Sequence, residues 1–120
     1  MRVLIADDSK AMRMIVLRTL RQTGLAVEDV HEAADGAEAL AAVPEFKPDL
    51  ILSDWNMPNM TGIEFLTALR ATGNMTRFGF VTSESNPSMR VQAIECGADF
   101  LLTKPFDADR LAEVVGIGVG

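Results

Sequence analysis

Hydrophobic residues in this chain form short unbroken runs separated by longer mixed segments. Four such runs cover residues 3–6, 50–52, 78–81 and 100–102, and each is followed at once by polar residues. A short apolar run bounded by chain breakers is typical of a strand buried on both faces, as in parallel sheets covered by helices. The pattern therefore predicts four buried strands, of which the second begins just after Pro48 and Asp49.

The segments between the runs carry apolar residues at helical spacing. After a possible N-cap at Ser9, a stripe recurs every three or four residues until Gly24 and predicts an amphipathic helix. Its members are Met12, Ile15, Val16, Thr19 and Leu20. Further helices are expected from Gly36 to Val43 with a stop at Pro44, across Phe65, Leu66 and Leu69, from Asn86 to Gly97, and from Asp107 to Val115. The mixed segment from Val27 to Ala33 fits an outer strand.

Five strands thus alternate with five helices along the chain. Right-handed crossovers then give one parallel sheet with helices on both faces, a doubly wound α/β fold. We expect one domain spanning residues 1–120, because this length and a hydrophobic content of 48% are enough for a single core. The glycines that follow Val115 disfavour a helix in the last residues, since each costs about 1 kcal/mol relative to alanine.

Composition and charge exclude several classes of function. A net charge of -6 offers no basic surface for nucleic acid, so direct nucleic-acid binding is not expected. The chain has no apolar run long enough to span a membrane, and its beginning turns acidic at Asp7, too early for a signal peptide. The lone Cys96 agrees with a reducing compartment. We expect a soluble, cytoplasmic and monomeric protein.

Polar side chains follow four of the predicted strands at the point where each strand ends. They are Asp7 and Asp8, Asp54, Thr82, and Lys104. Because the carboxyl ends of parallel strands share one edge of a sheet, we expect these side chains to lie together there. Taken alone, each has a simpler explanation, since Asp8 and Ser9 could cap a helix and a lysine is usually solvated. Their joint placement favours a chemical role.

Three neighbouring carboxylates repel one another and either raise a pKa or recruit a cation. Mg²⁺ suits them, because it takes oxygen ligands and keeps waters that a phosphate oxygen can replace. Lys104 adds a charge that attracts a phosphoryl group, and Thr82 adds a hydrogen-bond donor. The set indicates phosphoryl transfer to a carboxylate, with Asp54 as the nucleophile and no general base.

The stretch Asp54-Trp55-Asn56-Met57-Pro58, with the acidic pair, Thr82 and Lys104-Pro105 in order, resembles the receiver domain of two-component response regulators. The similarity covers nearly the whole chain and is greatest to the single-domain chemotaxis regulators. It implies a flavodoxin-like strand order of 2-1-3-4-5 and a cis bond before Pro105. It also implies a signalling switch, not an enzyme, which a histidine kinase phosphorylates and which signals to a protein partner that the sequence does not identify.

The same resemblance implies a role for each residue of the predicted site. Asp54 would be the phosphoacceptor, while Lys104 would pair with the phosphoryl group and Thr82 would bond to it. The Mg²⁺ ion would be held by Asp8 directly, by Asp7 through water, by Asp54, and by the backbone carbonyl of Asn56. Asn56 and Glu84 would flank the path of the water that removes the phosphoryl group, and neither is large and apolar enough to shield it.

The chain departs from the family pattern at Leu101, where the family usually carries a tyrosine or phenylalanine that moves with the threonine. An aromatic switch is therefore not expected. Two alternatives stay open: a receiver module cut from a larger regulator with an output domain, and an aspartate-nucleophile phosphatase. The phosphatase is disfavoured because Asn56 stands where such enzymes need a second aspartate as acid and base. A nucleotide-binding module is disfavoured because no glycine-rich phosphate loop follows the first strand.

Overall fold

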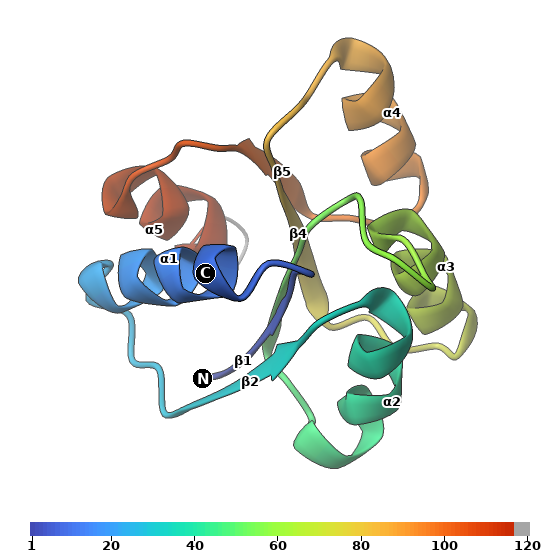
Figure 1. Cartoon of the computed structure of the whole chain (residues 1–120), viewed down its shortest axis with the longest axis horizontal. Coiled ribbons are helices and arrows are strands. Elements are labelled where there is room, and N and C mark those ends of the chain that lie inside the picture. Colours follow the sequence, from blue (N-terminus) through green and yellow to red (C-terminus); the bar gives the residue numbers. More distant parts are fainter. Residues whose placement is uncertain (117–120) are drawn as a thin grey trace.

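Strands and helices alternate strictly along the part of the chain that the computed structural model describes, residues 1–116. All five strands are parallel and pair in the order β2-β1-β3-β4-β5, which confirms the expected doubly wound topology (Figure 1). The elements are β1 (Arg2–Ala6), α1 (Lys10–Gln22), β2 (Asp29–Ala33), α2 (Gly36–Phe46), β3 (Leu50–Ser53), α3 (Gly62–Ala71), β4 (Arg77–Thr82), α4 (Pro87–Glu95), β5 (Phe100–Thr103) and α5 (Ala108–Gly116).

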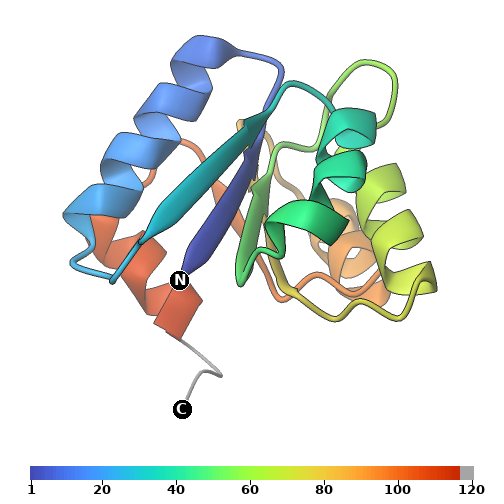
Figure 2. The ribbon, with the colours of Figure 1, turned by 90° about the horizontal axis from the view of Figure 1, so that it is seen from below.

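Helices cover both faces of the sheet and create two separate cores. Helices α1 and α5 lie on one face, and α2, α3 and α4 lie on the other (Figures 1 and 2). Alternate residues of one strand point to opposite faces, so Val3 and Ile5 of β1 join the core beneath α1 and α5, whereas Leu4 joins the other core. The unbroken apolar runs are therefore buried on both sides, as predicted.

The predicted stripe of α1 is only partly buried. Val16 and Leu20 are buried against the sheet, but 47% of Ile15 is exposed. The reason is that α1 rests on the sheet beside α5, so its buried stripe is narrower than the apolar stripe in the sequence. Ile15 lies at the margin of that contact, where it lines an apolar hollow with Phe106 of the loop before α5.

The predicted stop at Pro44 is wrong, because α2 continues through this residue to Phe46. A proline inside a helix loses one backbone hydrogen bond, but only two helical residues, Glu45 and Phe46, follow it here. The last turn is closed by Lys47, which takes the left-handed conformation at φ 52° and donates its N–H to the Val43 carbonyl over 2.9 Å. The C-terminal cap thus holds the last turn in spite of Pro44.

The last helix begins one residue later than predicted and extends one residue further. Asp107 is its cap rather than its first residue, since the side chain accepts a hydrogen bond from the Arg110 N–H over 2.8 Å. The helix continues through Gly116, and the rest of the glycine-rich segment, residues 117–120, lies outside the described residues.

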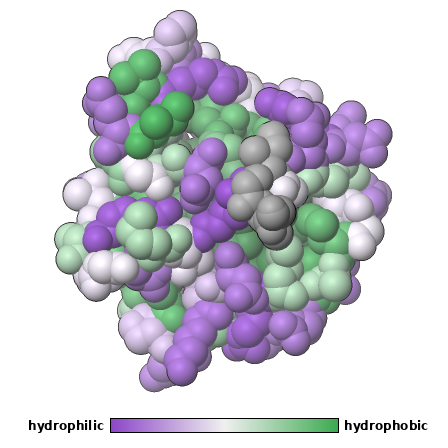
Figure 3. Space-filling view, turned by 180° about the vertical axis from the view of Figure 1, so that it is seen from behind, coloured by the Kyte–Doolittle hydropathy of each residue, from purple (hydrophilic) through white to green (hydrophobic). Residues whose placement is uncertain are grey.

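Two surface properties accompany this architecture. A hydrophobic patch lies over α4 in Figure 3, and Val91 and Ile94 of that helix are 55% and 68% exposed. Among the described helices, none has both the length and the apolar character needed to cross a bilayer.

Candidate functional site

The strands of the parallel sheet all point toward one edge, which faces upward in Figure 2. Asp7 and Asp8 follow β1 at this edge. Asp7 is buried, its backbone N–H donates to the Ala33 carbonyl over 3.0 Å, and its Oδ1 accepts from the Ser9 N–H over 2.9 Å. Ser9 caps α1 by accepting from the Met12 N–H. Asp8 is exposed and is not the cap, so its carboxylate remains available to a ligand.

Asp54 follows β3 and is anchored between β1 and α3. Its backbone N–H donates to the Ala6 carbonyl over 2.8 Å, and its Oδ1 accepts from the Trp55 N–H over 2.7 Å. Gly62 at the start of α3 packs so closely on the Asp54 carbonyl that a Cβ at position 62 would overlap it. The Asp54 side chain is only 16% exposed. The loop therefore delivers this carboxylate in a fixed orientation.

The three carboxylates form one group, which we call the acidic cluster (Asp7, Asp8 and Asp54). Each contributes an oxygen, and these oxygens all lie within 4.8 Å of one another. Burial raises the pKa of Asp54, the Lys104 charge lowers it, and the charges of Asp7 and Asp8 raise it further. An acidic oxygen set of this kind fits a hard divalent cation such as Mg²⁺, whose charge would remove the repulsion.

Lys104 reaches the acidic cluster from the end of β5. Its Nζ lies 3.1 Å from Asp7 Oδ2 and 4.0 Å from Asp54 Oδ2, and its side chain is 13% exposed. The Lys104–Pro105 peptide bond is cis, as the resemblance implied, and the Lys104 N–H donates to the Thr82 carbonyl over 2.7 Å. The structure thus brings the lysine and the carboxylates together from three strands.

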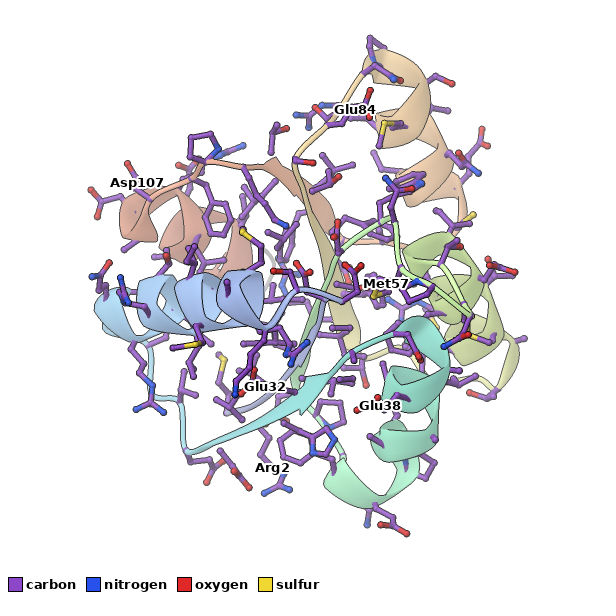
Figure 4. All side chains as sticks on the ribbon, viewed as in Figure 1. Arg2, Glu32, Glu38, Met57, Glu84 and Asp107 are labelled. Carbon is purple, nitrogen blue, oxygen red and sulfur yellow. The ribbon has the colours of Figure 1, made fainter. Side chains whose placement is uncertain are left out.

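Thr82 is the last residue of β4, Glu84 lies two residues beyond it, and Asn56 lies in the loop after β3; among the described residues none of them bonds to a carboxylate of the acidic cluster. Thr82 is buried at the end of β4, and its hydroxyl oxygen accepts from the Glu84 N–H over 3.4 Å. Accepting leaves the hydroxyl proton available to donate elsewhere. Asn56 and Glu84 are exposed, and Glu84 lies in the loop before α4 (Figure 4). No bulky apolar side chain stands at either position.

Two sets of contacts near the site were not evident in the sequence, and the first is at the start of α2. The Asp35 side chain caps α2 and also accepts from Asn59 Nδ2 over 2.7 Å, and the Gly36 N–H donates to the Met60 carbonyl over 3.1 Å. These bonds tie the loop that carries Asn56 to the start of α2. Asp35 is a recognisable cap in the sequence, but a second partner 24 residues away leaves no local signal.

The second set is made by Arg13, which the hydrophobic pattern places on the polar side of α1. Only 14% of its side chain is exposed. It bonds to the Asp7 carbonyl and to Glu32, which lies beside the start of α1 in Figure 4.

Leu101 occupies a buried position in β5, with 7% exposure, in the core beneath α2, α3 and α4. Trp55 is half-buried and packs on Phe80, with ring centroids 4.8 Å apart. Leu101 therefore fills space in the core beneath α4. The aromatic side chain nearest to Asp54 in the sequence is the indole of Trp55.

Comparisons with known proteins agree on one family. The family model for the response regulator receiver domain matches residues 3–116. The chain is 37% identical to the chemotaxis protein CheY of Bacillus subtilis over 114 residues, which cover 95% of this chain and 93% of that protein. It is 36% identical to the chemotaxis protein CheY of Pseudomonas aeruginosa over 117 residues, which cover 96% and 93%.

Longer regulators and solved structures are also similar. The chain is 41% identical to the transcriptional regulatory protein PrrA of Mycobacterium bovis over 114 residues, which cover 95% of this chain but 46% of PrrA. Among solved structures, Vibrio cholerae chemotaxis protein CheY4 superposes with a TM-score of 0.83 at 38% identity, covering 95% of this chain and 94% of that one. The receiver domain of the putative regulator NarL from Mycobacterium tuberculosis gives 0.86 at 33% identity, covering 95% and 91%.

Proposed function

Because this chain belongs to the response regulator receiver domain family, we propose that Asp54 is the residue that accepts the phosphoryl group. Receiver domains are phosphorylation-controlled switches that take a phosphoryl group from a histidine kinase and act on a downstream target. The observation that carries the proposal is the position of Asp54, whose carboxylate shares the acidic cluster and has Lys104 Nζ 4.0 Å from its Oδ2. The proposed domain spans residues 1–120.

The transfer needs a nucleophile and compensation of charge, and it does not need a base. An ionised Asp54 oxygen attacks phosphorus, the bond from phosphorus to the kinase's histidine nitrogen breaks, and its electron pair stays on the imidazole, which takes a proton from solvent. Lys104 would share the charge of the phosphoryl oxygens, and the Thr82 hydroxyl would donate to one of them. Asp54 thereby becomes an acyl phosphate.

The acidic cluster and the Asn56 carbonyl would hold Mg²⁺. When bound, this ion would neutralise the phosphoryl oxygens and the carboxylates together. Asp7 is fixed by bonds to both of its carboxylate oxygens, whereas Asp8 faces solvent, so the two suit an indirect and a direct ligand respectively. Loss of the phosphoryl group to water would use the same residues, with no separate catalytic site.

Similarity to two CheY proteins along nearly their whole length supports chemotaxis as the process that this switch serves. The half-length match to PrrA supports the alternative that the domain controls an attached output domain. The exposed Val91 and Ile94 of α4 offer a surface for the downstream partner. A pull-down with the phosphorylated and the unphosphorylated protein would separate a chemotaxis switch, which binds a separate partner protein, from a domain that controls an attached output domain.

Intact mass after incubation with a small phosphodonor and Mg²⁺ tests the proposal. We expect the mass of one added phosphoryl group, which Asp54→Asn and a chelator each abolish. Asp109→Asn is the matched control, because Asp109 is an exposed aspartate of α5 outside the site. Equal labelling of Asp54→Asn and Asp109→Asn would contradict the assignment of the acceptor. Steady turnover of a phosphate monoester by the wild type would instead favour the phosphatase alternative.

A further inference from the structure

Arg13 lies near the start of α1 and connects that helix to the ends of two strands. Its terminal nitrogen donates to the Asp7 carbonyl over 2.6 Å, and its Nε donates to Glu32 Oε1 over 3.0 Å. The arginine side chain is 14% exposed and the Glu32 side chain is 40% exposed. A guanidinium that is buried to this extent and bonded through two nitrogens is fixed in position.

The Asp7 carbonyl belongs to the peptide bond that joins Asp7 to Asp8. Holding its oxygen fixes the rotation of that peptide plane, and the plane sets the direction in which the Asp8 side chain leaves the backbone. The other polar groups of Asp7 have their own partners, which are the Ala33 carbonyl, the Ser9 N–H and Lys104 Nζ. The Asp8 carboxylate accepts no hydrogen bond within residues 1–116, so within that range the direction in which the side chain leaves the backbone is what places it.

We propose that Arg13 is a positioning residue for the metal site, acting through the Asp7–Asp8 peptide to aim the Asp8 carboxylate at the ion. The inference rests on the proposed function, which makes Asp8 a direct ligand of Mg²⁺. Glu32 has two parts in it: it holds the guanidinium in place and balances a positive charge that would otherwise oppose a cation. Arg13 and Glu32 together therefore hold the backbone next to the metal site without adding net charge there.

Charge and positioning predict opposite effects of removing Arg13. Removing a cation next to a Mg²⁺ site strengthens metal binding if charge alone matters. Removing a positioning group weakens it, since loss of a group that orients a ligand costs about tenfold or more in metal affinity. The direction in which the Mg²⁺ affinity of Arg13→Gln changes therefore separates the two effects. The double variant, Arg13→Gln with Glu32→Gln, separates them without any change in net charge.

Mg²⁺ titration followed by Trp55 fluorescence reports this affinity, because Trp55 directly follows Asp54 and its backbone N–H bonds to Asp54 Oδ1. We expect Arg13→Gln and the double variant to bind Mg²⁺ about tenfold more weakly, and Arg13→Lys, which keeps one donor, to recover part of the loss. Arg18→Gln is the control, because Arg18 is exposed on the same helix. Melting curves in chelator check that each variant is folded. If Arg13→Gln does not fold, the conservative Arg13→Lys still tests the proposal.

Each outcome bears on a different claim. Wild-type affinity in the double variant, or tighter binding in Arg13→Gln, would overturn the role of Arg13 while leaving the metal site in place. Absence of Mg²⁺ binding in the wild type would overturn the metal site itself, and with it this inference. A loss in the Arg13 variants with no loss in Arg18→Gln supports positioning.

Discussion

Replacing Asp54 with asparagine removes one negative charge from the acidic cluster and keeps the shape of the side chain. The amide oxygen can still accept the Trp55 N–H, so the loop after β3 loses no backbone contact. In the absence of metal, Asp54→Asn should therefore make the domain more stable at neutral pH, because the fold no longer buries a charge at this position and the repulsion between carboxylates disappears.

The size of the effect follows from the distances. At 4.8 Å, the upper limit of the oxygen separations in the acidic cluster, two carboxylate charges repel by about 3.5 kcal/mol at an effective dielectric constant of about 20. Attraction to Lys104 at 4.0 Å offsets about 4 kcal/mol of the repulsion from Asp7 and Asp8 together. Solvent screens the contribution of the exposed Asp8 most strongly, which leaves a net gain of about 1–2 kcal/mol in the free energy of unfolding. For a domain of this size, that gain raises the melting temperature by about 4–8 °C.

The gain must depend on pH in a defined direction. The pKa of Asp54 is raised in the fold, mainly by burial, so the folded protein binds more protons than the unfolded chain between the ordinary value of 3.8 and the raised value. Wild-type stability therefore increases as pH falls through the raised pKa toward 3.8. The advantage of Asp54→Asn should be full above the raised pKa and should shrink over the same window.

Thermal melting in chelator at several pH values measures this advantage. With saturating Mg²⁺ the order should reverse, since the wild type gains about 2.7 kcal/mol at a Mg²⁺ concentration of about 100 times Kd and the variant gains less. Asp109→Asn controls for a general loss of negative charge. Lower stability of Asp54→Asn in chelator, or a gain that does not change with pH, would refute the reasoning.

Three further predictions concern the sensor, the switch and the lifetime of the phosphorylated state. Trp55 fluorescence should change on adding Mg²⁺ and again on adding beryllofluoride, and a flat titration of folded protein would place the metal elsewhere. Leu101→Ala should destabilise the fold by about 2–5 kcal/mol but should reduce the gain in partner affinity on phosphorylation only slightly. Thr82→Ala should instead reduce that gain strongly and change stability less. An equal loss of the gain in both variants would make Leu101 a working switch. Bulkier or cationic residues at Asn56 and Glu84 should slow Mg²⁺-dependent loss of phosphate after donor removal, and decay that is already slow in the wild type would contradict a short-lived signal.

The strands and the polar edge could be predicted from the sequence because both depend on local patterns. An apolar run such as Leu50–Leu52 reports burial on two faces, and the rule that parallel strands end at one edge then gathers Asp7, Asp54 and Lys104 there. Their observed placement within a few ångströms follows from topology alone and needs no knowledge of side-chain contacts.

The errors arose where particular backbone or side-chain contacts override a rule based on residue type and spacing. Pro44 is a strong breaker in isolation, but the Lys47 cap holds the last helical turn, which includes Pro44. Arg13 fits a solvated face by its spacing, yet two acceptors from other elements bury it. The bond from Asn59 to Asp35 joins residues from different loops, so no periodicity or spacing in the sequence could indicate it.

The central claim is that Asp54 carries the phosphoryl group, and the most direct measurement is its location and chemical type in the labelled wild-type protein. After treatment with a small phosphodonor and Mg²⁺, the account predicts a phosphate that hydroxylamine releases, as expected for an acyl phosphate, and a peptide map that places it on Asp54. An acid-stable phosphate on a serine or threonine, or label on any other aspartate, would contradict the account.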